Sequence, residues 1–360
     1  MTDAEKVREY KCPCCGSGLY FSDENQKLTC RSCENSFDVQ DVKDYNDAME
    51  AAGSSESEWE EAAAGWSDEE RQTVNVYTCP SCAGELMTDE NTAATFCPYC
   101  ENPVILTGRL SGGLRPDGVL PFQTSLEDAK AAFLAECKRK PLLPKFFTEE
   151  QRIEKITGIY VPYWLYDCGC QASERYRGTR TQSWSDANYH YVRTSHYLLV
   201  RAGEAEFTGV PMDGSRKMED HLMESLEPFD YSKLEPFHTG YLSGFLADKY
   251  DVDADDGKQR IRQRLGETMD VLLRETCMGY GAVTPTGGNL QVRHGKVRYV
   301  LLPVWILNTQ YRGKTYTFAM NGQTGKITGS FPICPKRSWA WFGGICAGVT
   351  ALVTALQWLF

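Results

Sequence analysis

The chain has 360 residues, of which 42% are hydrophobic, so it is long enough for two or three domains with a sizeable core. Its formal net charge of −11 argues against a protein whose main task is to coat nucleic acid, because such proteins neutralise phosphates with Lys and Arg. The segment 77–108 has four acidic residues and no Lys or Arg, which disfavours nucleic-acid binding there as well.

Eight of the fifteen cysteines form two copies of one pattern. Each copy has two Cys-x2-Cys pairs separated by fourteen residues, and each cysteine of the first copy recurs 67 positions later. Four thiolates in two such pairs suit the tetrahedral shell of a structural zinc ion. The pattern predicts two tandem zinc ribbons with two structural Zn²⁺ ions, whose ligands are Cys12, Cys15, Cys30, Cys33, Cys79, Cys82, Cys97 and Cys100.

Four protein ligands close a coordination shell, so both sites are expected to be structural rather than catalytic. Cys14 offers another thiol in the first ribbon, but only Cys12 and Cys15 keep the two-residue spacing. Iron is the alternative metal, since it also binds four thiolates. Cysteines kept as metal ligands indicate a reducing compartment, and the polar residues 1–11 are not expected to act as a secretory signal.

The first ribbon is predicted at 1–40 and the second at 74–108, with an acidic, partly helical linker at 41–73. Trp59 and Trp66 stand seven residues apart, which would place them on one face of a linker helix. They would then dock the linker on a ribbon or on a partner. The alternative is a mobile acidic linker with two anchoring side chains.

Residues 109–335 are predicted to form an α+β domain rich in β-structure. Ser125 and Asp128 make a capping box that opens a helix, and a run of aromatic and β-branched residues begins at Gly158. Further strands are predicted at 189–201, 204–210, 289–293 and 297–309.

Helices of this domain are also predicted from Thr148, at 217–226 and at 257–276. The last is the longest. Its expected apolar face consists of Ile261, Leu265, Thr268 and Leu272. A hairpin is predicted at 316–328, where Asn321 and Gly322 would supply the positive φ angles of the turn.

Two short segments of the domain are alike, Val161–Leu165 and Leu302–Ile306, which suggests an internal duplication. The sequence contains no nucleophile elbow, HExxH motif, kinase motif set, dinucleotide fingerprint or phosphate loop, so we expect a protein that is not an enzyme. The rival hypothesis is an enzyme in the β-rich domain that uses the aromatic strand around Tyr163 and Trp164 as a binding wall.

The C-terminal segment 338–360 contains no charged residue. A helix over the last 21 residues, at roughly 1.5 Å per residue, is long enough for a hydrocarbon core of about 30 Å. Trp339, Trp341 and Trp358 stand near its ends, as interfacial aromatic residues do, and Lys336 and Arg337 precede it. These features predict a single pass through the cell membrane with the N-terminal bulk in the cytoplasm. The alternative is a buried or amphipathic helix packed on the domain.

Three segments resemble a bacterial family from Gram-positive anaerobes, the TFIIB-type zinc ribbon-containing proteins. They are Tyr10–Gly16, Cys97–Cys100 and Thr315–Lys326. Members are also labelled primosomal replication protein or superfamily II helicase, but this sequence lacks the phosphate loop of a helicase and is too short and acidic for the motor. The resemblance covers nearly the whole chain and implies two zinc sites and a C-terminal membrane segment. It implies no established activity.

The sequence therefore predicts a zinc-binding, membrane-anchored adaptor or scaffold whose ribbons mediate protein–protein interaction. The expected partners are a protein of unknown identity and the membrane, the latter through the C-terminal helix. The alternative is a nucleic-acid-associated zinc ribbon protein linked to replication or transcription, which the missing basic patch disfavours.

Overall fold

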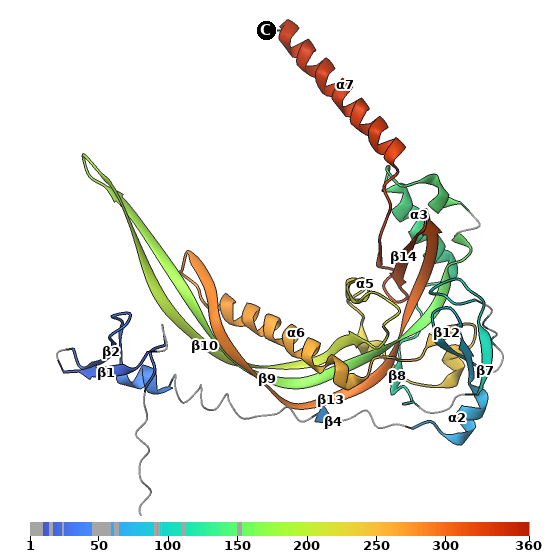
Figure 1. Cartoon of the computed structure of the whole chain (residues 1–360), viewed down its shortest axis with the longest axis horizontal. Coiled ribbons are helices and arrows are strands. Elements are labelled where there is room, and N and C mark those ends of the chain that lie inside the picture. The colour runs from blue at the N-terminus through green and yellow to red at the C-terminus, as the bar shows by residue number, and fades with distance from the viewer. Residues whose placement is uncertain are drawn as a thin grey trace, which may run out of the picture. The chain divides into compact units, whose positions relative to one another are not determined.

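The computed structural model of the chain describes residues 10–13, 17–23, 25–44, 59–60, 65–89, 92, 94, 96–109, 113–149 and 153–359. These residues form a mixed α+β structure with a large β-sheet and an apolar C-terminal helix, which confirms the predicted fold class at that level (Figure 1). The chain divides into two compact units. Unit 1 is Met1–Glu60, Tyr166–Val210 and Lys258–Lys296, and unit 2 is Glu61–Leu165, Pro211–Gly257 and Val297–Phe360.

Strand lengths range from two to thirty residues. The strands are β1 (Leu19–Ser22), β2 (Lys27–Cys30), β3 (Ser36–Phe37), β4 (Trp59–Glu60), β5 (Asn75–Thr78), β6 (Glu85–Thr88), β7 (Ile105–Arg109), β8 (Gly118–Val119), β9 (Thr157–Ser185), β10 (His190–Asp213), β11 (Glu235–Pro236), β12 (Leu246–Asp248), β13 (Ala282–Tyr311), β14 (Lys314–Asn321) and β15 (Ile327–Gly329). The helices are α2 (Asp68–Thr73), α3 (Leu126–Lys138), α5 (Asp220–Ser225), α6 (Ala254–Glu275) and α7 (Pro335–Leu359).

The sheet of unit 2 joins the second cysteine-rich segment to the β-rich domain. Its strand order is β11-β8-β13-β9-β12-β6-β5-β7, and β14 and β15 extend it from β13. β12 pairs in parallel with β9 and antiparallel with β6, which belongs to the segment predicted as the second ribbon. The strands of this ribbon are therefore continuous with the body of unit 2.

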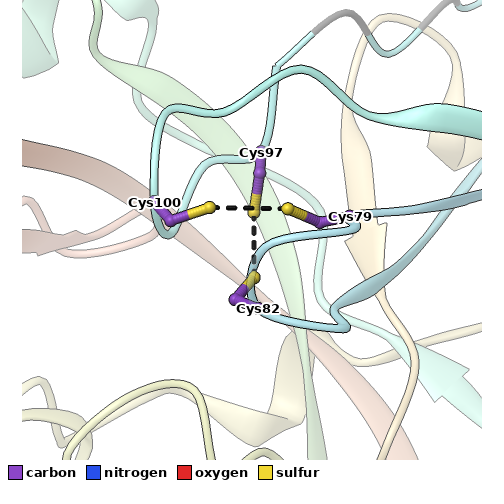
Figure 2. Close-up of side chains that lie close together, drawn as sticks. All are labelled: Cys79, Cys82, Cys97 and Cys100. Carbon is purple, nitrogen blue, oxygen red and sulfur yellow. Dashed lines mark hydrogen bonds between the residues drawn. The ribbon is translucent and has the colours of Figure 1, made fainter.

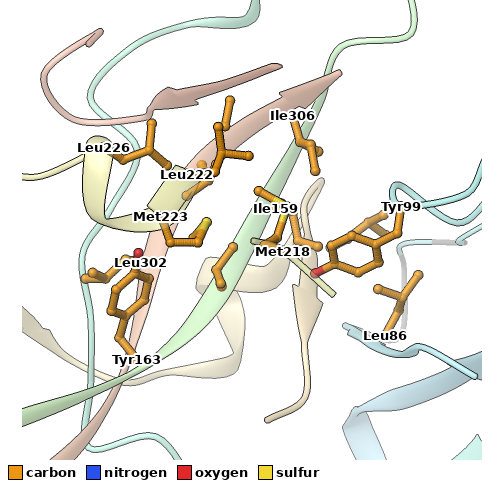
Figure 3. Packing of buried hydrophobic residues seen from close by; sticks show 14 of the residues in the cluster. Leu86, Tyr99, Ile159, Tyr163, Met218, Leu222, Met223, Leu226, Leu302 and Ile306 are labelled. Carbon is orange, nitrogen blue, oxygen red and sulfur yellow. The ribbon is translucent and has the colours of Figure 1, made fainter. Parts of the chain in front are cut away.

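One hydrophobic core serves both parts of unit 2. Cys79, Cys97 and Tyr99 of the cysteine-rich segment belong to the same buried cluster as Ile159 and Val161 of β9. Figure 3 shows Tyr99 and Leu86 packed near Ile159 and Met218. Burial of this apolar surface holds the small ribbon on the larger sheet.

Helix α3 begins as the sequence predicts. The Ser125 hydroxyl accepts a hydrogen bond from the Asp128 backbone N–H, and the Asp128 carboxylate accepts one from the Ser125 N–H, so the capping box is complete. Ala129, Phe133 and Cys137 are buried on one face of the helix, in a second core cluster that also contains Phe318.

In unit 1, helix α6 lies along a sheet made from parts of β9, β10 and β13 (Figure 1). Alternate residues of β9 are buried, as expected for a strand with one covered face: Cys168, Cys170, Ala172 and Tyr176. The Tyr176 hydroxyl donates to the Asp270 carbonyl of α6 at 3.2 Å.

The predicted apolar face of α6 is correct at Ile261 and Leu265 and wrong beyond them. The buried residues that follow are Met269 and Leu273, whereas Leu272 is exposed. A repeat of four keeps each residue nearly above the last, so the true face follows that spacing to its end.

The strands predicted with gaps are continuous. The predicted 189–201 and 204–210 are one strand, β10, and 289–293 and 297–309 lie within β13. The hairpin from β14 to β15 exists, but its turn differs from the prediction. The Asn321 side-chain oxygen accepts from the backbone N–H of Gln323 and Thr324, and the positive φ of 74° belongs to Gly325.

The two linker tryptophans do not share a helix. Trp59 lies in β4 and packs edge-on against Tyr166 within unit 1, at a ring-centroid distance of 5.3 Å. Trp66 precedes α2 and packs edge-on against Phe237 within unit 2, at 5.6 Å. The expectation of a common helix face was therefore wrong, although both side chains are anchored.

Helix α7 contains the predicted membrane segment. Its stretch Pro335–Leu356 has a mean hydropathy of 1.6 and is long and apolar enough to cross a membrane, and 0% of its most apolar window is buried. The alternative of a C-terminal helix packed on the domain is not what the described residues show. The side chain of Trp358 lies outside them.

Candidate metal centres

Four predicted ligands of the second ribbon meet at one point (Figure 2). The Sγ atoms of Cys79, Cys82, Cys97 and Cys100 all lie within 4.8 Å of one another. The separations are 3.4 Å between Cys79 and Cys100 and 3.6 Å between Cys82 and Cys97. Four thiolates around one tetrahedral zinc ion stand about 3.8 Å apart, given Zn–S bonds of about 2.3 Å. The donor set and its spacing thus fit a metal ion of this kind.

Two backbone knuckles hold these sulfurs. In the first, the Cys79 N–H donates to the Gly84 carbonyl at 2.9 Å, and the Ala83 N–H donates to the Cys79 carbonyl at 2.8 Å. In the second, the Cys97 N–H donates to the Asn102 carbonyl at 2.8 Å. These bonds close each Cys-x2-Cys segment into a tight loop and direct both of its sulfurs to the same side.

The residue that follows the second cysteine of each such loop has a left-handed backbone. The φ angle is 55° at Ala83 and 59° at Glu101. The same position of the first ribbon, Glu34, has 59°. This conformation is unfavourable for a residue with a Cβ, so the knuckle hydrogen bonds and the clustered sulfurs must maintain it.

Two asparagines that are not among the predicted site residues support the clusters. The Asn102 side-chain N–H₂ donates to the Cys100 Sγ at 3.5 Å, and the Asn35 side-chain N–H₂ donates to the Cys33 Sγ at 3.3 Å. Such donors stabilise the negative charge of a ligand thiolate. The signal was available, because the Glu-Asn pair at 34–35 recurs at 101–102 with the same offset as the cysteines.

The local environment favours thiolates at some positions of the clusters. Burial raises the pKa of Cys79, but the backbone N–H groups of Cys82 and Ser81 outweigh it and lower this pKa to about 7. The Asn35 backbone N–H likewise lowers the pKa of Cys33 below its usual value. Burial raises the pKa of Cys97. A metal ion would remove the remaining thiol protons on binding, because only thiolates ligate it.

The first cluster is smaller among the described residues. The Sγ atoms of Cys12, Cys30 and Cys33 lie within 4.8 Å of one another, and Cys12 and Cys33 are 3.5 Å apart. The predicted ligand Cys15 and the neighbouring Cys14 lie outside the described residues. The Cys30 N–H donates to the Asn35 carbonyl at 2.9 Å, so this knuckle has the same bond as those of the second cluster.

A buried polar network joins the second cluster to the sheet, and no sequence pattern announced it. Asp248 of β12 is fully buried. Its carboxylate accepts from the Tyr99 hydroxyl at 2.7 Å, from the Ser215 hydroxyl at 2.6 Å and from the Lys217 ammonium at 2.9 Å. Tyr99 stands between the ligands Cys97 and Cys100.

The positive charge of Lys217 lies beside the negative charge of Asp248 in this network. Burial by itself lowers the pKa of Lys217, but the Asp248 carboxylate raises it above its usual value. Burial and the same carboxylate raise the pKa of Tyr99, so its hydroxyl keeps the proton that it donates. Gly84 lets Lys217 approach the knuckle, because a Cβ at this position would lie 3.3 Å from the Lys217 Cε and 3.5 Å from the Cys82 Sγ.

Several cysteines outside the two clusters are small buried residues. Cys137, Cys168, Cys170 and Cys277 are each at most 6% exposed. Cys168 and Cys170 lie on one face of β9 with their sulfurs 3.9 Å apart.

The fold and the clusters define a class: an α+β protein with two cysteine clusters that could hold metal ions, compatible with zinc ribbons, and one C-terminal helix that could span a membrane. The chain is 35% identical over 342 residues to the uncharacterized protein YdjG of Bacillus subtilis (strain 168), with 95% of each chain covered. It belongs to the same family as YdjG. No family model and no solved structure matches the chain.

Proposed function

We propose that this protein is a membrane-anchored, zinc-binding adaptor. Its ribbons hold one structural Zn²⁺ each and bind another protein, and α7 keeps the complex at the cytoplasmic face of the cell membrane. In this proposal the chain is one of the TFIIB-type zinc ribbon-containing proteins that its motifs resemble, and it has no catalytic role.

The observation that carries the proposal is the second cysteine cluster together with its surroundings. Four thiols within 4.8 Å of one another leave no coordination position for a water nucleophile, so a bound ion would stabilise structure. Exposed apolar side chains flank the ligands of the cluster in the sequence, and exposed apolar surface favours contact with another protein. They are Phe96 (62% exposed), Ile105 (59%) and Leu106 (53%).

The first ribbon offers similar support. Phe21 is 52% exposed and Tyr20 is 40% exposed, and both lie on β1 beside the first cluster. Large apolar residues are costly on such small modules, which have little core of their own. The exposure of these side chains favours a partner protein that binds both ribbons and covers them.

Charge favours a protein partner over nucleic acid. The described part of the second ribbon, like the whole segment 77–108, carries no Lys or Arg. Binding to a nucleic-acid backbone depends on cations that neutralise phosphates. Glu85 and Glu101 of this ribbon already pair with Lys249 and Lys155, so the expected partner surface is mainly apolar.

The anchor rests on α7, whose apolar stretch is uncovered by the rest of the described chain. Lys336 and Arg337 lie at the N-terminal end of this stretch, and an excess of such residues marks the cytoplasmic end of a span. This charge pattern supports a cytoplasmic location for the ribbons and the sheet.

Co-purification of the full-length protein from detergent-extracted membranes tests the proposal. We expect a stoichiometric protein partner that is lost in the Cys79→Ser/Cys82→Ser variant and kept in the matched Cys334→Ser variant. Cys334 is a free cysteine outside both clusters. Recovery of nucleic acid with a steep salt dependence and no protein partner would overturn the proposal in favour of a replication or transcription role.

A further inference from the structure

The end of the hairpin formed by β9 and β10 has no covering element among the described residues of unit 1. Every residue from 181 to 194 is exposed, on both faces of this two-stranded ribbon. An isolated hairpin is marginally stable in water, so a long exposed one calls for a partner surface.

Aromatic side chains gather at this end. Trp184 is 50% exposed and Tyr189 is 68% exposed. Trp184 stacks on Tyr191 across the hairpin, with ring centroids 5.5 Å apart and an interplanar angle of 13°. Tyr189 lies next to Tyr191 at a centroid distance of 6.2 Å. The three rings form one contiguous aromatic tip, which we define as Trp184, Tyr189 and Tyr191.

Several hydrogen bonds close the turn between β9 and β10, which carries the aromatic tip. Asp186 accepts from the backbone N–H of Asn188 at 2.8 Å and of Tyr189 at 2.7 Å, and from the Tyr191 hydroxyl at 2.9 Å. The Asp186 N–H donates to the Tyr189 carbonyl at 2.9 Å. These bonds fix the rings in place before any partner arrives, which lowers the entropic cost of binding.

We propose that the aromatic tip inserts into the headgroup region of the membrane leaflet at which α7 enters. This inference rests on the membrane anchor of the proposed function and adds a second contact with the same bilayer. Trp and Tyr suit this region because each combines an apolar ring with a polar group that stays hydrated.

The membrane anchor α7 favours lipid as the surface that the aromatic tip contacts. One helix among the described residues is long and apolar enough to cross a membrane, and the hairpin lies N-terminal to it. The hairpin therefore stays on the side from which α7 enters. A tether to the bilayer gives the tip a high effective lipid concentration, so a weak insertion suffices.

The charge of the hairpin end fits a neutral lipid interface. Between 181 and 194 the one acidic residue, Asp186, is balanced by one basic residue, Arg193. Three hydrogen bonds compensate the Asp186 carboxylate, which lowers the cost of bringing it near the headgroups. Insertion should therefore not require anionic lipid.

Fluorescence quenching in proteoliposomes tests the inference. Full-length protein is reconstituted in phosphatidylcholine vesicles with and without lipids brominated at shallow acyl positions. Three variants, Trp184→Phe, Trp339→Phe and Trp66→Phe, isolate the emission of each tryptophan by difference from the wild type. Trp339 of α7 is the positive control, and Trp66, which is 6% exposed, is the buried negative control.

We expect the brominated lipids to remove most of the emission of Trp184 and of Trp339 and little of that of Trp66. Tyr189→Asp should restore the Trp184 emission, because a charge at the tip opposes insertion, and should leave Trp339 quenched. Quenching of Trp339 without Trp184 refutes the aromatic tip contact and leaves the anchor standing. If neither is quenched, both ideas fail. Trp184 protected from aqueous acrylamide yet untouched by brominated lipid would mean that a protein surface covers the tip, which also overturns the inference.

Discussion

Asp248 shows how much one residue distant in sequence contributes to the second cluster. It is 149 positions from Tyr99, yet its fully buried carboxylate accepts hydrogen bonds from the Tyr99 hydroxyl and the Lys217 ammonium. A buried ion pair tolerates the removal of both charges better than the removal of one, because a lone buried charge loses its compensation.

Asp248→Asn should therefore lower the free energy of unfolding by about 3 kcal/mol, since among the described residues Asp251, at 3.5 Å, would be the ion-pair partner left to Lys217. Urea denaturation of the detergent-solubilised protein, followed by tryptophan emission, measures this. Lys217→Met combined with Asp248→Asn should lose less than Asp248→Asn alone. The exposed Asp253→Asn variant is the control, and equal midpoints for it and for Asp248→Asn would contradict the prediction.

Glu70 is a second residue with a testable charge effect. It pairs with Arg115 at 2.8 Å, and the hydrogen bonds from Arg115 lower the pKa of its carboxyl. Because the folded-state pKa lies below the unfolded value, the ionised group adds stability above the unfolded pKa, and this stability is lost as the pH falls through the folded pKa.

Glu70→Gln should cost about 0.5 kcal/mol of unfolding free energy at pH 7, since the ion pair is partly hydrated. The difference from the wild type should shrink as the pH falls below about 4.3, the usual unfolded value for Glu. Denaturation midpoints across that pH range, with the exposed Glu69→Gln as control, check the sign. A difference that grows toward acid pH would refute this account.

At the scale of elements, the second ribbon is built by metal ligands and by the sheet together. β6 pairs with β12, and β5 pairs with both β6 and β7. The two Cys-x2-Cys knuckles are therefore connected to strands that belong to the sheet of unit 2. Loss of the metal ion would therefore loosen the ribbon without freeing its strands from the sheet.

Cys79→Ser/Cys82→Ser should lower the zinc content from two ions to one per chain, because two ligands cannot hold a structural site. Limited proteolysis should then cut first in the knuckles, whose left-handed residues Ala83 and Glu101 lose their support. Metal analysis and mapping of the cleavage sites measure both effects, with Cys334→Ser as the matched control. Two ions retained in the double variant would disprove the ligand assignment.

At the scale of the whole molecule, α7 is the described element that could hold the protein at a membrane. Leu352 is 62% exposed and lies in the stretch that could cross a membrane. An Arg near the centre of such a span costs about 3 kcal/mol, whereas an Arg at the end can reach the interface.

Leu352→Arg should thus shift part of the protein from the carbonate-resistant membrane fraction to the soluble one. Ser338→Arg, which adds a charge beside Lys336 and Arg337, should leave the distribution unchanged. Immunoblots of fractionated cells give the ratio. Identical fractionation of Leu352→Arg and wild type would argue that α7 does not span the bilayer.

Local patterns in the sequence were sufficient to predict which described cysteines cluster, the capping box of α3 and the apolar extent of α7. Each depends on residues within a few turns or on a fixed cysteine spacing. The same local logic failed in α6, where the predicted face took a step of three residues from Leu265 to Thr268 and so reached the exposed Leu272. It also failed where a side chain replaced the backbone in a turn, as at Asn321.

What the sequence determined by itself is the chemistry of the cysteine pairs and the apolar C-terminal helix, because thiol spacing and a run of uncharged residues act through local geometry. Only the tertiary structure brought Tyr99, Ser215 and Lys217 to Asp248. It also merged the second ribbon with the large sheet. These contacts join residues more than thirty positions apart, and their energy comes from shared burial, which no single stretch of the chain encodes.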